Sequence, residues 1–327
     1  MYKDSKIYVA GHTGLLGSAL IKKLNEYGYK HIITRFHAEL DLTNKEAVFD
    51  FFFTERPEYI FLAAGKVGGI ISNKTYPADY FQINISIQDA VFEAAVEYDV
   101  KQLIFYGSSC IYPKFSPQPI KEQHLFTAPI EETSEAYATA KIAGIIACRA
   151  YNQQYKTNRF IALVPNSMYG PGDNFDLENC HVLSALIRRF HEAKINNAGS
   201  VTLLGSGKVR REFICSEDVA EASLFVMQHV NQLENKHYNV GTGQDYSIEE
   251  LATNITKIIG YEGKVLWDTS KPDGTPRKLL DSSRLLSLGW KPVVGLEDGL
   301  RRMYRWFQNR SNTISQVSEK FEDSHAK

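Results

Sequence analysis

The chain has 327 residues, 43% of them hydrophobic, which is long enough for a packed enzyme of one large domain or of a large and a small domain. Lysine and arginine number 37 against 38 for aspartate and glutamate, and the formal net charge of -1 excludes a bulk field that favours nucleic acid or an anionic membrane. Any anionic ligand must therefore meet local basic groups.

The N-terminal segment is short and polar before the first apolar residues, and it lacks the hydrophobic stretch that a secretory signal needs. No later segment approaches the ~20 apolar residues of a membrane-spanning helix. The four cysteines, at positions 110, 148, 180 and 215, stand apart without CxxC pairing. This spacing is typical of reduced thiols in a cytosol rather than of a disulfide framework or a zinc site. We therefore expect a cytoplasmic protein without a metal.

Short β-branched or aromatic segments alternate with amphipathic helical patterns through the first half of the chain. The expected strands cover residues 7–9, 32–34, 59–62, 103–106 and 160–164. The expected helices cover residues 15–27, 44–54, 77–98 and 134–155. This repetition predicts an α/β fold with a doubly wound parallel sheet of the Rossmann type.

After Pro165 the alternation loosens, and further helices are expected near residues 181–195, 217–230, 247–259 and 295–308. We expect a cofactor-binding Rossmann domain at 1–165, to which segments near 205–240 return. A smaller, discontinuous substrate-binding α/β domain is expected at 166–310, followed by a polar tail at 311–327 that frays. The substrate should lie between the two parts, because ligands of open α/β sheets bind beyond the carboxyl ends of the strands.

A glycine-rich turn follows the first strand directly, with the sequence Gly11-His12-Thr13-Gly14-Leu15-Leu16-Gly17. Glycines at a strand-to-helix turn let the backbone approach a pyrophosphate, which amide groups and the positive end of the helix then hold. A plain tight turn is the alternative interpretation. The position after strand one, opening an amphipathic helix, favours a dinucleotide site.

The second strand leads into Arg35, where NAD-specific proteins usually carry an acid. An arginine there suits the 2'-phosphate of NADP, although a solvated charge at the end of a strand is the alternative. Asp41 and Leu42 are expected on the adenine side, and Ala63 and Ala64 are small where the backbone passes the cofactor. We predict that the cofactor is NADPH or NADP.

Tyr137 and Lys141 are four residues apart and therefore share one face of a helix. A phenol with a pKa of ~10 exchanges its proton poorly near neutrality, and a nearby ammonium group stabilises the phenolate. Ser108, at the end of the fourth strand, is placed to hydrogen-bond a substrate carbonyl. The order of glycine turn, serine and Tyr-x-x-x-Lys distinguishes this pattern from a chance pair on a solvated helix.

These motifs and several longer strings resemble the extended short-chain dehydrogenase/reductases over nearly the whole chain and, within them, the GDP-L-fucose synthases. The strings that carry the resemblance are residues 65–70, 107–114, 137–144, 179–182, 188–191 and 271–278. The resemblance implies NADPH, a GDP-linked 4-keto-6-deoxy sugar and a homodimer. It also implies that Ser108, Tyr137 and Lys141 form a reductase triad.

By the same resemblance, Cys110 and His181 match the pair that epimerises C3' and C5', whose hydrogens the neighbouring ketone acidifies. Without the resemblance, each is more often an ordinary buried thiol or an ordinary histidine at a helix start. The cofactor-side residues that the resemblance carries over are Lys141, Pro165, Asn166, Met168 and His181. Those on the substrate side are Ser109, Arg189, Leu204, Arg211 and Lys278.

Two local departures from the family concern its sugar pocket. The family usually has Pro-Thr-Asn-x-Tyr-Gly after the fifth strand, where this chain has Pro-Asn-Ser-Met-Tyr-Gly from Pro165. Leu204 stands where the family tends to carry tryptophan before a Gly-Ser-Gly loop. A different or bulkier sugar, such as a heptose in place of a hexose, fits these changes. Epimerisation need not accompany reduction, because a reductase can inherit Cys110 and His181.

Two other functions are open. An NAD-retaining nucleotide-sugar 4-epimerase or 4,6-dehydratase is one, but dehydratases typically carry Asp-Glu where this chain has Ser109-Cys110. A non-catalytic NADP-binding sensor is the other, but such proteins commonly lose the tyrosine or the lysine. We expect an NADP-dependent oxidoreductase that reduces the 4-keto group of a GDP-linked 4-keto-6-deoxy sugar, with or without 3,5-epimerase activity.

Overall fold

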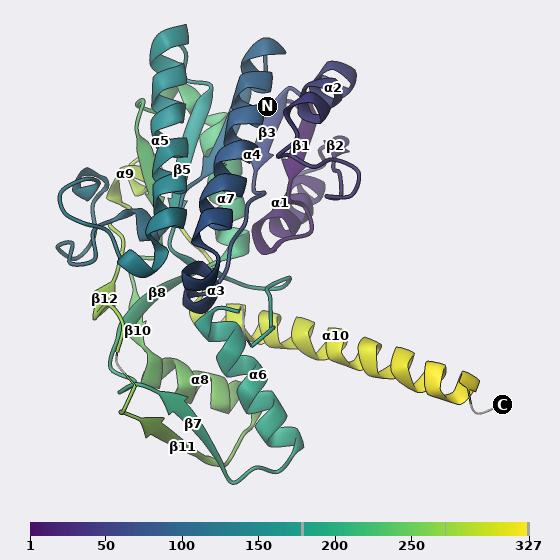
Figure 1. Ribbon diagram of the computed structural model, residues 1–327, viewed down its shortest axis with the longest axis vertical. Coiled ribbons are helices and arrows are strands. Elements are labelled where there is room, and N and C mark those ends of the chain that lie inside the picture. Colours follow the sequence, from purple (N-terminus) through teal and green to yellow (C-terminus); the bar gives the residue numbers. More distant parts are fainter. Residues whose placement is uncertain (178–179, 272, 326–327) are drawn as a thin grey trace.

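The computed structural model describes residues 1–177, 180–271 and 273–325 (Figure 1). Its main element is a six-stranded sheet in the order β2-β1-β3-β4-β5-β9, in which neighbouring strands pair in parallel. The strands are β1 (Lys6–Ala10), β2 (His31–Ile33), β3 (Tyr59–Leu62), β4 (Gln102–Tyr106), β5 (Phe160–Pro165) and β9 (His237–Val240). The predicted doubly wound parallel sheet is confirmed, and β9 is a sixth strand that the sequence patterns did not identify.

Helices cover both faces of this sheet because its buried strands carry apolar side chains on both sides. Tyr8 and Ile60 pack toward α2, α4 and α5, whereas Ile7 and Phe61 pack toward α1 and α7. The helices are α1 (Leu15–Glu26), α2 (Lys45–Glu55), α4 (Pro77–Glu97), α5 (Glu135–Tyr155) and α7 (Ser216–Gln228). Helix α7 packs against α1, so a segment far along the chain joins the first layer.

The second part of the molecule lies beyond the carboxyl edge of the large sheet, in the lower half of Figure 1. Its central strand β8 pairs with β6, β10 and β12, and β7 pairs with β11. These strands are β6 (Ser167–Tyr169), β7 (Ser200–Leu204), β8 (Arg210–Cys215), β10 (Asp245–Ser247), β11 (Lys264–Asp268) and β12 (Arg277–Lys278). A separate core joins α6 (Val182–Ile195), α8 (Ile248–Ile259) and the first half of α10 (Leu296–His325).

Short elements complete the chain. They are the helices α3 (Ile70–Thr75) and α9 (Ser283–Leu286) and the single 3-10 turns η1 (Ser109–Ile111), η2 (Glu122–His124), η3 (Glu132–Ser134) and η4 (Val230–Gln232). Within the described ranges, no helix has the length and the apolar character needed to cross a bilayer.

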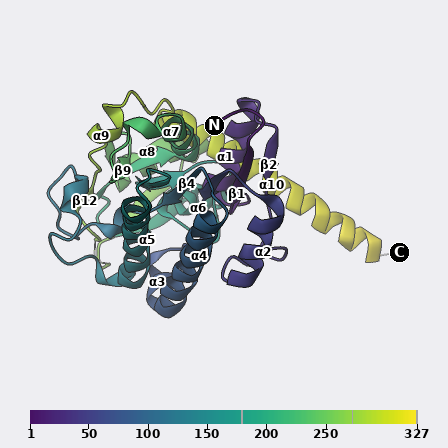
Figure 2. The same ribbon diagram turned by 90° about the horizontal axis from the view of Figure 1, so that it is seen from above.

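Helix α10 is longer than the predicted helix at 295–308, and in Figure 2 it projects away from the rest of the molecule. Its first turns carry the ion pairs Arg301–Glu297 and Arg302–Asp298, each four residues apart. The segment from 311, expected as a frayed polar tail, is helical as far as His325. A polar composition predicts exposure, but without glycine or proline it contains no signal that ends a helix.

Candidate active site

A cavity of about 2010 Å³ opens between the two parts of the molecule. Leu62, Tyr106 and Pro165, at the carboxyl ends of β3, β4 and β5, line one side of it. Phe213 of β8 and Lys278 of β12 line the other side. The volume is larger than the ~300–1,000 Å³ typical of a pocket for one small molecule, so it accommodates a cofactor and a substrate together.

The glycine-rich turn at the start of α1 is as tight as a dinucleotide site requires. Gly11 has φ +77°, and a Cβ there would lie 2.8 Å from the backbone nitrogen of Ala64. A Cβ on Gly17 would lie 2.0 Å from the Gly11 carbonyl oxygen. No side chain caps the amide groups at the start of α1, and residues 13–16 line the cavity. The turn therefore fits the pyrophosphate of a dinucleotide.

Arg35 follows β2, as expected for a residue near an adenosine ribose, but it already has protein partners. Its Nη1 donates to the Thr34 carbonyl at 2.8 Å, and its Nη2 pairs with the Glu55 carboxylate of α2. The guanidinium carbon lies 5.4 Å from the centre of the Phe51 ring. Arg35 does not line the cavity, so its contact with a 2'-phosphate stays a prediction.

The predicted triad is brought together on the cavity wall. Tyr137 and Lys141 on α5 are only 9% and 6% exposed. The Lys141 Nζ donates to the Tyr106 carbonyl at 3.0 Å and lies 5.7 Å from the centre of the Tyr137 ring. The Ser108 hydroxyl is hydrogen-bonded to Tyr137. This is the arrangement of a hydroxyl, a phenol and an ammonium group that proton transfer to a carbonyl oxygen requires.

Burial acts on the charge states of the triad. It raises the pKa of Tyr137, while the hydrogen bond with Ser108 opposes the rise. It also lowers the pKa of Lys141 to about 8. At neutral pH the phenol therefore keeps its proton, and Lys141 is mostly an ammonium group. Tyr137 is in the state from which an acid donates, and Lys141 is ready to stabilise the phenolate that results.

Cys110 and His181 face the same cavity from the two different parts of the molecule. Burial raises the pKa of the Cys110 thiol, and the ammonium groups of Lys278 and Lys141 and the bond with Ser108 oppose that rise. His181 is exposed at the residue before α6. The buried Asp173 lies near it and accepts from the Ser184 hydroxyl of α6 at 2.6 Å. A thiol and an imidazole are thus both available to a ligand in the cavity.

Most of the other predicted site residues also line the cavity. Those that do are Thr13, Gly14, Leu15, Leu16, Ala63, Ala64, Ser109, Pro165, Asn166, Met168, Arg211 and Lys278. Arg211 and Lys278 supply the local basic groups that a diphosphate needs in a chain of net charge -1.

Several predicted residues lie off the cavity wall. Gly11 and Gly17 are inside the turn, and His12 packs its ring against Phe36 at 4.8 Å between ring centres. Leu42 is a core residue, 7% exposed, and the Asp41 carboxylate accepts from Thr43. Their roles in binding stay predictions.

Two substrate-side residues are also outside the wall. Leu204 on β7 is 63% exposed, and Arg189 on α6 points to solvent. Its neighbour Arg188 lines the cavity instead, donating to the Phe175 carbonyl at 2.9 Å and to Glu192 at 2.7 Å. Ile187 and Phe190 are both buried and stand next to Arg188 and Arg189 respectively, so the helical phase of the apolar residues does not distinguish the two arginines.

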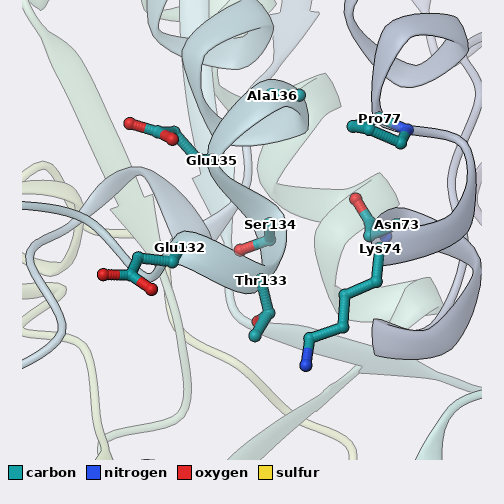
Figure 3. Close-up of a pocket in the computed structure, with 8 residues that line it drawn as sticks. All are labelled: Asn73, Lys74, Pro77, Glu132, Thr133, Ser134, Glu135 and Ala136. Carbon is teal, nitrogen blue, oxygen red and sulfur yellow. The ribbon is translucent and has the colours of Figure 1, made fainter.

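A group of polar residues before α5 was not identified from the sequence. Glu131, Thr133 and Ser134 line the large cavity, and Glu131 pairs with Lys114 at 2.9 Å. A smaller hollow of about 330 Å³ is lined by residues 132–136 and, from the other side, by Asn73, Lys74 and Pro77 (Figure 3). There the buried Asn73 donates to the carbonyls of Gly68 and Gly69, both at 3.0 Å, and holds the glycine-rich loop that borders the large cavity.

Comparison with known proteins agrees with this geometry. Residues 7–241 match the model of the NAD dependent epimerase/dehydratase family. GDP-L-fucose synthase 1 of Arabidopsis thaliana is 53% identical over 305 residues, which cover 93% of this chain and 94% of that protein.

Two solved structures from Campylobacter jejuni share the fold. A GDP-6-OMe-4-keto-L-xylo-heptose reductase is 39% identical with a TM-score of 0.88, covering 95% of this chain and 99% of that one. A GDP-mannoheptose C4 reductase with NADP bound is 41% identical with a TM-score of 0.87, covering 94% and 99%. The chain therefore belongs to the NAD dependent epimerase/dehydratase family and, within it, is a relative of the GDP-L-fucose synthases.

Proposed function

We propose that this protein is an NADPH-dependent oxidoreductase that reduces the 4-keto group of a GDP-linked 4-keto-6-deoxy sugar. The observation that carries the proposal is the triad of Ser108 with the buried Tyr137 and Lys141, which lies in one cavity with a glycine turn that fits a dinucleotide. NADPH binds to the six-stranded part and the nucleotide sugar to the part built around β8. The activities named for the relatives support the same chemistry.

The triad explains how the protein assists the reduction. NADPH supplies the hydride that reaches C4' of the sugar. Ser108 donates a hydrogen bond that orients the carbonyl, and Tyr137 gives its proton to O4'. The Lys141 ammonium group stabilises the resulting phenolate, because a positive charge nearby favours the charged form of a phenol.

The substrate side of the cavity suits a nucleotide diphosphate. Arg211 and Lys278 lie on neighbouring strands, paired directly in the register of β8 and β12. Burial lowers the pKa of both groups, so they form a desolvated basic pair in which an anion is held strongly. The guanine preference is supported by the GDP-linked substrates in the relatives' names.

The sugar is a 6-deoxy hexose or a heptose. Ser167 lines the cavity and is smaller than the asparagine usual in the GDP-L-fucose synthases at that place, which leaves space for a longer carbon chain. The heptose reductases among the solved relatives agree with that space, and the plant relative agrees with a hexose.

A second activity, 3,5-epimerisation, is favoured by Cys110 and His181. The reaction removes a proton beside the ketone and returns one on the opposite face of the sugar ring. Both groups line the cavity. Burial raises the pKa of the Cys110 thiol, and the positive charges of Lys278 and Lys141 oppose that rise.

The deciding experiment is incubation with NADPH and GDP-4-keto-6-deoxymannose in deuterated water, with the product identified by mass and NMR. A fucose-configured product with deuterium at C3' and C5' supports both activities. Reduction without deuterium supports the 4-reductase alone. If the protein oxidises NADPH with neither this substrate nor the heptose analogue, the proposal is wrong. A 4-epimerase without net oxidation or reduction, or a non-catalytic sensor, would then remain.

Assembly and location are part of the proposal as well. We expect a homodimer in the cytoplasm, as the family resemblance implies. Sedimentation of the purified protein at micromolar concentration tests the dimer, and a monomer would contradict it.

A further inference from the structure

Glu212 is a fully buried carboxylate in the middle of β8. Its neighbours Arg211 and Phe213 both line the cavity, whereas Glu212 does not. Because side chains alternate along a strand, Glu212 points to the opposite face of β8, behind the wall of the site. It touches neither ligand position directly, and the mechanism above does not use it.

Four donors surround the carboxylate. The Asn166 side-chain amide and the Leu280 backbone N–H, at 2.9 Å, donate to Oε2. The Gly243 backbone N–H, at 2.7 Å, and the Thr242 hydroxyl, at 3.4 Å, donate to Oε1. A Cβ on Gly241 would lie 2.5 Å from Oε1, so the approach of this loop depends on glycine. Burial raises the pKa of Glu212, and the hydrogen bonds from these donors oppose that rise.

The donors come from three segments that the chain keeps far apart. Asn166 follows β5 and Gly243 follows β9, two neighbouring strands of the large sheet. Leu280 follows β12, and Glu212 itself lies on β8, both in the second part. Glu212 therefore joins the cofactor side of the cavity to the substrate side at a single buried point.

The hydrogen bonds of Glu212 also involve residues that line the cavity or adjoin those that do. Asn166 lines the cavity, and its side-chain amide also approaches the Lys278 carbonyl oxygen at 3.4 Å. The Asn166 Oδ1 accepts a hydrogen bond from the backbone N–H of Ser167 at 3.0 Å. Both residues belong to the segment after β5 whose sequence differs from the usual family pattern. A shift of Glu212 would thus move residues of both binding surfaces.

We propose that Glu212 is a positioning residue of the reductase, which sets the separation between the nicotinamide site and the sugar site through Asn166 and the segment 278–280. The inference rests on the proposed function, because it concerns hydride transfer across this junction. Transfer requires reacting atoms ~3–3.5 Å apart, and a displacement of ~1 Å from a remote change can reduce the rate ~100-fold.

The test uses Glu212→Gln, which keeps the shape but places an amide NH₂ against N–H donors. We expect kcat for the keto sugar to fall about 10- to 100-fold while KM and the Kd for NADPH change less than about 3-fold. With NADPH deuterated at the transferred hydrogen, the isotope effect on kcat should increase, because hydride transfer becomes more rate-limiting. A merely structural role would leave that isotope effect unchanged.

Glu217→Gln is the matched control. Glu217 is 6% exposed and pairs with Lys22 at 2.7 Å and Arg302 at 3.0 Å, but it does not line the cavity. This variant should lose thermal stability and keep kcat per folded molecule. If both variants show the same kcat and the same isotope effect, the positioning role is wrong.

A second variant keeps the test open if Glu212→Gln does not fold. Asn166→Ala removes one donor from the opposite side, and it should reproduce the loss of kcat and the larger isotope effect. The double variant should lose less kcat than the product of the two separate fold-losses, because both substitutions remove the same Asn166–Glu212 hydrogen bond. Full multiplicative losses would overturn the inference. An inactive wild type would instead contradict the proposed function, so the two failures are distinguishable.

Discussion

The two sides of the cavity are built in different ways. The cofactor side begins with seven consecutive residues, 11–17, whose geometry follows from a strand, a tight turn and a helix in direct succession. The substrate side draws on α6, β8 and β12, which are not consecutive along the chain and meet only in the folded protein. A binding site formed by consecutive residues can be recognised in the sequence as a motif. A binding site formed by segments that are distant in sequence depends on tertiary packing, which no short sequence motif specifies.

The largest effect is expected at the triad, where the two sides meet. Tyr137→Phe removes the acid and should reduce kcat about 100- to 10,000-fold. NADPH binding should be nearly unchanged, because the aromatic ring remains. Stopped-flow turnover and fluorescence titration of NADPH measure the two quantities, and unaltered turnover would show that Tyr137 is not the acid.

Cys110→Ser tests the proposed epimerase pair separately from the reduction. It should stop solvent deuterium from entering C3' and C5', because a hydroxyl is a far weaker base than a thiolate. Reduction of an already epimerised sugar should continue at a rate close to that of the wild type. NMR of the product measures both, and deuterium at undiminished rates would remove Cys110 from the epimerase assignment.

Gly17→Ala tests the cofactor side alone. The added Cβ would meet the Gly11 carbonyl at 2.0 Å, so the turn must open. Overpacking of this kind typically costs about 1–3 kcal/mol, and we expect a lower free energy of unfolding together with weaker NADPH binding. Gly199→Ala is the control, because a Cβ there meets nothing within 4 Å. Equal NADPH affinities for the two variants would contradict the tight-turn argument.

The pH dependence of kcat tests the role of Lys141. Its pKa is lowered to about 8 by burial, so the ammonium group is present below that pH and is lost above it. If the phenolate needs this charge, kcat should fall as pH rises through about 8, by roughly tenfold per pH unit. A profile of kcat from pH 6 to 10 measures this, and a flat profile would exclude Lys141 as the stabilising charge.

The smallest effect is expected at Arg35, at the far end of the cofactor side. Arg35→Ala should reduce the preference for NADPH over NADH by about tenfold, equivalent to ~1.4 kcal/mol. Glu55→Gln should have the opposite sign, because it releases the guanidinium from its carboxylate partner. Comparison of kcat/KM with the two cofactors measures both, and no change in either variant would mean that Arg35 does not meet the 2'-phosphate.

Most of the large sheet could be predicted from local patterns. Strand-length apolar segments such as 59–62 and helical patterns such as 77–98 have the period and the length that define their type, and the structure confirms them. Strand β9 could not be identified, because its four residues include His237 and Asn239, whose side chains are buried and hydrogen-bonded to Tyr112. Polar residues that find partners inside the protein remove the apolar signal on which strand prediction depends.

The sequence by itself determined the doubly wound sheet, the glycine turn and the Ser108, Tyr137 and Lys141 triad, because each depends on local spacing or on the order of motifs along the chain. Only the tertiary structure decided that Arg188 rather than Arg189 lines the cavity and that Arg35 is paired with Glu55. It also decided that Glu212 joins the two sides. The physical reason is that these choices depend on the rotation of a helix and on contacts between distant segments, which hydrophobic burial sets when the two parts pack together.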